Sequence, residues 1–122
     1  GIFPFQVMAT LEPLMSARQL LDLCIRAKIL SAKEAQEIGI VSEVVQEENL
    51  ASRVQELIAE IKEQSPTAIR LGLKAFQEMK TKSADEKHKY LHAMLMECLK
   101  SKDAAEGLTA FKEKRKPEWK GN

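Results

Sequence analysis

Apolar residues recur every three to four positions over much of the chain, which is the spacing of one face of an α-helix. Three such stripes lie in residues 49–64, 66–80 and 83–100, with charged residues on the opposite sides. Each stripe predicts an amphipathic helix that must pack against another element. The apolar members are Leu50, Val54, Leu57, Ile58 and Ile61; Ile69, Leu73 and Phe76; and Leu91, Met94, Leu95, Cys98 and Leu99.

Five serines mark where helices begin, because a serine hydroxyl can accept from the unpaired backbone N–H groups of a first helical turn. Ser16, Ser31 and Ser83 each precede a Gln or Glu by three residues, which is the capping-box pattern. Ser65 precedes a proline, and Ser101 has an acidic residue two positions later. The predicted helices are 4–12, 16–26, 31–38, 49–64, 66–80, 83–100 and about 102–115.

One segment predicts a β-strand. Residues 40–45 are rich in β-branched residues and apolar on both faces, and they follow Gly39, which we expect to end the preceding helix. No second strand of comparable quality is present, and Lys28-Ile29-Leu30 is the only short candidate. Since an unpaired strand leaves backbone groups without partners, we expect the strand's partners to lie outside this sequence.

Composition narrows the class of protein. With 122 residues the chain has the length of one domain, and 19 basic against 18 acidic residues give a net charge of +1. This balance argues against a general nucleic-acid or membrane-surface binder, and no apolar stretch is long enough to span a bilayer. Two isolated cysteines predict a reducing, intracellular compartment rather than a disulfide scaffold.

Candidate chemical groups are few. His88 and His92 are four residues apart on a predicted helix but have no third metal ligand at a fitting spacing, so we expect surface histidines and no metal site. Cys24 and Cys98 fall on apolar stripes and are interpreted as buried thiols. The adjacent pair Glu47-Glu48 is better explained by contact with the positive end of the next helix than by acid–base catalysis.

The C-terminal tail differs from the rest. Residues 111–120 hold five basic and two acidic residues, with Phe111 and Trp119 among them. Cations suit phosphate groups and aromatic faces suit a purine ring, whereas a solvated helix end explains the same composition equally well. Composition alone leaves both interpretations open.

Residues 101–121 resemble the C-terminal signature of the enoyl-CoA hydratase/isomerase (crotonase) superfamily. The pattern D-x-x-E-G-x-x-A-F-x-E-K-R-x-P-x-W matches throughout. Residues 30–45, 65–70 and the opening Gly1-Ile2-Phe3-Pro4 resemble further family segments, so the resemblance covers the whole chain in register. The matching tail residues are Asp103, Glu106, Gly107, Ala110, Phe111, Glu113, Lys114, Arg115, Pro117 and Trp119.

The resemblance implies a mostly α chain of about seven helices and one strand, from the C-terminal part of the α/β crotonase (ClpP-like) spiral fold. Residues 1–48 would be the end of the β/α core, and residues 49–122 a helical trimerisation region with a tail that contacts coenzyme A (CoA). It also implies a homo-oligomer, either a trimer or a dimer of trimers, acting on an acyl-CoA substrate with no cofactor.

The resemblance assigns CoA binding to Phe111 and Lys114, with Lys114 at a phosphate and Phe111 near the adenine. The family's oxyanion-hole donors and catalytic glutamates precede the G-I-F-P turn, so no catalytic residue is expected here, and we expect an inactive C-terminal fragment of an enoyl-CoA hydratase. Departures at Phe5-Gln6-Val7-Met8 and Arg26-Ala27-Lys28 leave isomerase or CoA-thioester hydrolase chemistry as alternatives. A stand-alone, non-catalytic helical oligomerisation module is the rival class.

The chain starts at Gly1 rather than Met and carries no signal or transit pattern, which is expected of a processed piece, a tagged chain or a fragment. The expected location is cytoplasmic, or mitochondrial in a eukaryote.

Overall fold

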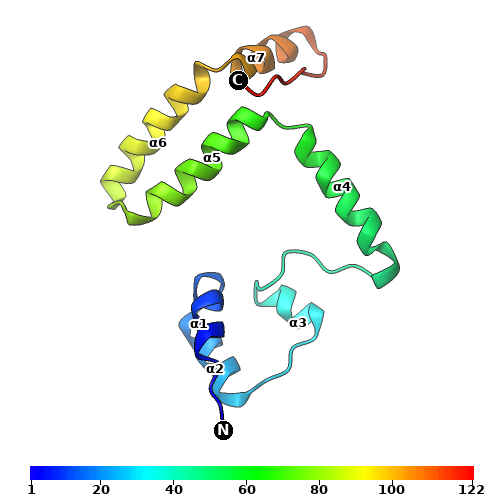
Figure 1. The fold of residues 1–122 in the computed structure, drawn as a ribbon, viewed down its shortest axis with the longest axis vertical. Coiled ribbons are helices and arrows are strands. Elements are labelled where there is room, and N and C mark those ends of the chain that lie inside the picture. The colour runs from blue at the N-terminus through cyan, green and yellow to red at the C-terminus, as the bar shows by residue number, and fades with distance from the viewer. The chain divides into compact units, whose positions relative to one another are not determined.

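The computed structural model describes residues 1–122, and these form helices joined by turns and loops (Figure 1). They divide into two compact units, Gly1–Arg53 and Val54–Asn122. The first unit holds α1, a 3-10 turn, α2, α3, a second 3-10 turn and the start of α4. Their bounds are Phe5–Leu11, Glu12–Leu14, Ala17–Arg26, Ala32–Glu37, Glu47–Asn49 and Leu50–Lys62.

The second unit contains the rest of α4 and three more helices. These are α5 (Pro66–Glu78), a 3-10 turn (Met79–Thr81), α6 (Ala84–Leu99) and α7 (Lys102–Glu113). Every predicted helix is therefore present, with ends within two residues of the prediction. None of the helices combines the length and apolar character that a membrane crossing requires.

The helices α2, α3, α5, α6 and α7 begin at the predicted serines. Ser16 and Ser31 form complete capping boxes with Gln19 and Glu34. Ser83 donates its backbone N–H and its hydroxyl to the carboxylate of Glu86, at 2.9 and 2.7 Å. These bonds satisfy backbone and side-chain groups that the first turn of a helix otherwise leaves unpaired, which explains why local sequence fixes these boundaries. Ser65 and Ser101 accept from the N–H groups of Ala68 and Ala104.

The predicted strand at residues 40–45 is wrong for this chain, because the structure contains no strand there or at Lys28-Ile29-Leu30. Gly39 does end α3, with a φ of 85°, and the N–H groups of Ile40 and Val41 both point back to the carbonyl of Ala35, at 2.8 and 3.4 Å. The N–H groups of Ile40 and Val41 therefore cap the C-terminus of α3 and cannot pair with a strand. No neighbouring strand within the chain pairs with the rest of the segment.

Helices α5 and α6 form an antiparallel hairpin within the second unit (Figure 1). The phenol of Tyr90 on α6 donates to the carboxylate of Glu78 on α5 at 2.6 Å. The ammonium of Lys82, in the turn, lies 4.7 Å from the centre of the same ring. These contacts join the two ends of the turn, and α7 packs against both helices.

The apolar core is small. Leu20 and Cys24 are buried in the first unit, and Ala75, Met94 and Ala110 in the second. Much of each predicted apolar stripe remains accessible, and Leu73 on α5 and Leu95 on α6 are 64% and 55% exposed. The chain therefore forms amphipathic helices, as predicted, but does not by itself cover their apolar faces.

Candidate functional site

Phe111 and Lys114 lie at the C-terminal end of α7. Phe111 is 84% exposed, and Lys114 is exposed at the position where the helix stops. The backbone of Lys114 is left-handed, with φ 54° and ψ 39°. Its N–H points back to the carbonyls of Ala110 and Phe111, and the next N–H, that of Arg115, bonds to Ala110 at 3.0 Å. The left-handed residue therefore turns the chain sharply away from the helix axis.

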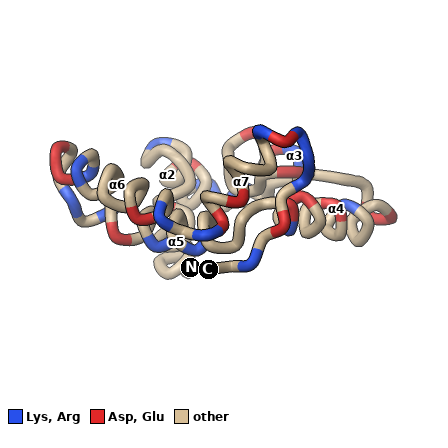
Figure 2. The backbone as a smooth tube through the Cα atoms, turned by 90° about the horizontal axis from the view of Figure 1, so that it is seen from above, with Lys and Arg blue, Asp and Glu red and all other residues tan.

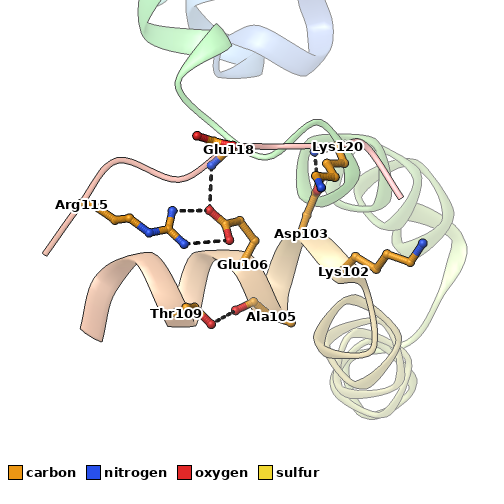
Figure 3. A pocket seen from close by; sticks show the side chains of 8 residues that line it. All are labelled: Lys102, Asp103, Ala105, Glu106, Thr109, Arg115, Glu118 and Lys120. Carbon is orange, nitrogen blue, oxygen red and sulfur yellow. Dashed lines mark hydrogen bonds and ion pairs between the residues drawn. The ribbon is translucent and has the colours of Figure 1, made fainter. Parts of the chain in front are cut away.

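After this turn, Arg115 returns to the side of α7. Its guanidinium donates to both carboxylate oxygens of Glu106, at 2.6 and 3.1 Å (Figure 3). Its Nε also donates to Glu113, at 2.7 Å. Glu106 also accepts from the backbone N–H of Glu118 at 2.8 Å. These contacts lower the pKa of Glu106 to about 2. The hydrogen bonds from Arg115 are the larger cause, and the bond from the Glu118 N–H is the next. This two-point arginine–carboxylate geometry is among the stronger side-chain contacts in proteins.

Asp103 fixes the end of the tail from inside the protein. It is 1% exposed, and its carboxylate accepts from the hydroxyl of Ser65 at 2.9 Å and from the N–H groups of Lys120 and Gly121 at 2.9 and 3.1 Å. Burial alone raises the pKa of Asp103, but these hydrogen bonds outweigh it and hold the pKa well below its usual range. Asp103 thus joins the start of α5, the start of α7 and the tail.

Two further contacts complete the attachment. The indole N–H of Trp119 donates to the carbonyl of Glu63, just after α4, at 2.8 Å. The carbonyl of Asn122 accepts from the N–H groups of Lys102 and Asp103, at 3.0 and 3.2 Å. We call residues 115–122, held in this way, the stapled tail. It lies back along α7, so that the end of the chain is beside the start of that helix (Figure 1).

The basic side chains of residues 111–120 fall into two groups. Arg115 and Lys116 form ion pairs, with Glu106 and Glu63 respectively. None of the ion pairs of this segment includes Lys112, Lys114 or Lys120. Elsewhere acidic and basic residues are interspersed along the helices rather than gathered by sign (Figure 2). The predicted phosphate ligand Lys114 therefore has an ammonium free to take a ligand.

A hollow of about 590 Å³ lies between α7 and the stapled tail, and most of the residues that line it are charged (Figure 3). Asp103 and Glu106 line it, but their hydrogen bonds hold both carboxylates ionised near neutral pH. Neither carboxylate is poised to donate a proton, and Phe111 and Lys114 lie outside this hollow. We call the contacts of Asp103, Glu106 and Glu63 with the stapled tail the staple. The hollow is bounded by these contacts and is not a reaction centre.

The other sequence candidates are dispersed. His88 and His92 lie on α6, and no cluster of three metal-ligating side chains includes them. Cys24 is buried on α2, as predicted, while Cys98 is partly buried on α6; both are free thiols. Glu47 and Glu48 lie in the 3-10 turn directly before α4, near the positive end of that helix as predicted.

Sequence reasoning missed the staple itself. The sequence places Asp103 at a helix start and Trp119 among the aromatic residues of the tail, but it predicts neither the contacts of Asp103 and Glu106 with the tail nor that of Trp119 with Glu63. One signal was available: Gly107 in the interior of a predicted helix is unfavourable unless something packs closely against it. In the structure that neighbour is the ring of Trp119.

Comparison with known proteins agrees with the resemblance. The family model for enoyl-CoA hydratase/isomerase matches residues 1–122. A Xenopus laevis protein named enoyl-CoA hydratase domain-containing protein 3, mitochondrial, is 35% identical over 99 residues, covering 81% of this chain and 34% of that protein. A carnitinyl-CoA dehydratase from Salmonella arizonae is 30% identical over 105 residues, covering 83% of this chain and 40% of that protein.

The fold has solved counterparts. An enoyl-CoA hydratase/isomerase from Mycobacterium paratuberculosis superposes on all of this chain with a TM-score of 0.89 and 25% identity, over 49% of its own length. The chain thus spans a third to a half of these relatives, and its helices are those of part of a crotonase-type enzyme. With the family model matched over every residue, the chain belongs to the enoyl-CoA hydratase/isomerase family.

Proposed function

We propose that this chain forms the C-terminal part of an acyl-CoA enzyme, and that the complete protein adds water across the double bond of a 2-enoyl-CoA. The observation that carries this is the end of α7, where an exposed aromatic ring and an ammonium without an ion pair lie one turn apart. CoA presents phosphates and an adenine, which suit a cation and an aromatic face. Lys114 would meet a phosphate and Phe111 would lie near the adenine.

The reaction centre would lie outside these 122 residues. In the family, two backbone N–H groups stabilise the enolate of the thioester, and two glutamates handle water and its proton. The two carboxylates beside the tail cannot replace such glutamates, because Arg115 and backbone N–H groups already occupy them. The chain on its own is therefore proposed to be inactive, with the acyl-CoA as substrate and no cofactor.

The two parts of the chain would have different roles. Residues 1–48 would complete the β/α core. Residues 49–122 would form a helical trimerisation region, giving a trimer or a dimer of trimers. The accessible apolar stripes support this proposal, since residues such as Leu73 and Leu95 need a cover that this chain does not supply.

Hydration is favoured over its alternatives by the names of the relatives, which include a carnitinyl-CoA dehydratase. Isomerase and CoA-thioester hydrolase activities of the complete protein are the alternatives. We infer an intracellular location, mitochondrial if the source is eukaryotic, because the frog relative is named mitochondrial and the two cysteines are free thiols.

The test is an activity assay with crotonyl-CoA as the substrate. The reaction is monitored through the loss of the conjugated double bond of crotonyl-CoA. The complete protein is expected to turn over crotonyl-CoA, whereas the isolated 122-residue chain is expected to show no rate above background. Turnover by the isolated chain would contradict the placement of the reaction centre. A complete protein that assembles in sedimentation experiments but neither binds nor converts acyl-CoA would instead be the rival oligomerisation module.

A further inference from the structure

Lys114 occupies a backbone conformation that disfavours lysine. Only two residues other than glycine have a positive φ, Ala27 and Lys114. A Cβ crowds the following carbonyl in this left-handed region, so glycine is the residue most often found where a helix ends this way. The chain follows that preference at the end of α3, where Gly39 has a φ of 85°, whereas α2 ends on the left-handed Ala27. At the end of α7 it carries an exposed lysine instead.

The backbone around Lys114 is held on both sides. The preceding residue, Glu113, is bonded through its carboxylate to Arg115, and Arg115 is bonded through its guanidinium to Glu106. The N–H of Arg115 is bonded to the carbonyl of Ala110. Lys114 is therefore flanked by two anchored residues, while its own ammonium has no partner. A side chain held at its base and free at its tip is suited to meeting a ligand.

The end of a helix explains why a cation is needed at this place. The last carbonyls of α7 give its C-terminus a partial negative charge, which repels a phosphate. Glycine would relieve the backbone strain at residue 114 but leave that repulsion in place. A lysine offsets it and supplies a donor to the phosphate oxygens.

From these observations we propose that Glu106 and Arg115 are positioning residues. They hold Lys114 in its left-handed conformation so that its ammonium meets a phosphate of CoA, and lysine is retained there at the expense of stability. This inference rests on the proposed function, because it takes Lys114 to be a CoA ligand. In this proposal the contacts between α7 and the stapled tail increase CoA affinity only by positioning Lys114.

The first experiment separates strain from binding. Lys114→Gly and Lys114→Ala are each expected to weaken the binding of CoA to the complete protein about tenfold, measured by isothermal titration calorimetry. Lys114→Gly is also expected to melt a few degrees higher than Lys114→Ala, since only glycine relieves the left-handed backbone. A Lys114→Gly variant that melts no higher than Lys114→Ala would overturn the claim that lysine is strained here.

The second experiment is a double-mutant cycle. Glu106→Gln is expected to weaken CoA binding about fivefold when Lys114 is present and to cause no further loss when residue 114 is alanine. Equal losses in both backgrounds would mean that Glu106 acts on the fold in general, and would overturn the positioning role. Glu63→Gln is the matched control, because it breaks the exposed Lys116 ion pair of the same tail and should leave CoA affinity within about twofold.

The outcomes distinguish the two proposals. If Lys114→Ala binds CoA as tightly as the unmodified protein, the assignment of Lys114 as a CoA ligand fails, and this inference fails with it. If Lys114→Ala weakens binding but the Glu106→Gln loss is the same in both backgrounds, only the positioning role fails.

Discussion

The ring of Trp119 lies directly over Gly107. A Cβ at Gly107 would lie 3.2 Å from Cη2 of Trp119, which is closer than carbon atoms normally approach. The absence of a side chain at residue 107 therefore lets the tail lie flat on α7, and the indole N–H then reaches the carbonyl of Glu63. This pair explains two positions of the family motif by packing rather than by catalysis.

Replacing Gly107 by alanine tests this contact, with Gly72 in α5 as the control. No atom lies within 4 Å of a Cβ at Gly72, so Gly72→Ala should stabilise the protein by about 0.5–1 kcal/mol through helix propensity alone. Gly107→Ala gains the same propensity but must displace the Trp119 ring, and should be about 1 kcal/mol less favourable than Gly72→Ala. Chemical denaturation measures both, and equal stabilisation would contradict the contact.

Removing the charge of Asp103 should release the end of the tail. Asp103→Asn keeps the size of the side chain but replaces one acceptor oxygen by an NH₂ group that faces N–H donors. The melting temperature is expected to fall by about 5–10 °C. The fluorescence of Trp119, the only tryptophan, is expected to shift to longer wavelength as the ring becomes exposed.

The control for this variant is Asp22→Asn, which removes an exposed carboxylate paired with Arg26. Exposed pairs contribute little, so this change should leave both the melting temperature and the fluorescence almost unaltered. Similar losses in the two variants would mean that the burial of Asp103 has no special role.

The staple should weaken in acid. Glu106 has a folded-state pKa of about 2 against an ordinary value of 4.5. A lowered folded-state pKa means that the stabilising contribution is complete above pH 4.5 and is lost as the pH falls toward 2. Asp103, whose pKa is also lowered, acts in the same direction. Trp119 fluorescence should report release of the tail within this window.

Glu106→Gln provides the comparison for the acid titration. The stability of the Glu106→Gln variant should fall less steeply between pH 4.5 and 2 than that of the unmodified protein. The variant lacks the carboxylate of Glu106 and keeps only that of Asp103 to be protonated. Parallel pH profiles for the two proteins would show that Glu106 is not bound in the way described.

The helices could be predicted because their signals are local. Ser16, Ser31 and Ser65 bond within their own first turns, so each boundary depends on a few neighbouring residues. The strand at residues 40–45 could not be judged in this way, since a strand exists only through hydrogen bonds to a partner. Residues 40–45 have the β-branched composition of a strand, but composition alone does not supply the missing neighbour.

The site was predicted only in part. Exposure of Phe111 and Lys114 follows from a helix end rich in charge, but their assignment to CoA came from the family pattern and remains a prediction. The staple depends on contacts between distant positions, such as Ser65 with Asp103 and Glu63 with Trp119. No periodicity reveals such pairs, because they form only when α4, α5, α7 and the tail meet.

The most direct test of the account is the KM for an enoyl-CoA substrate in the complete protein, compared between Lys114→Ala and Lys112→Ala. Both variants remove one lysine from the same end of α7, but only Lys114 lies at the left-handed turn. Lys114→Ala is expected to raise KM about tenfold with kcat within about twofold, while Lys112→Ala changes neither. An unchanged KM for Lys114→Ala would contradict the account and make Lys114 an ordinary solvated lysine.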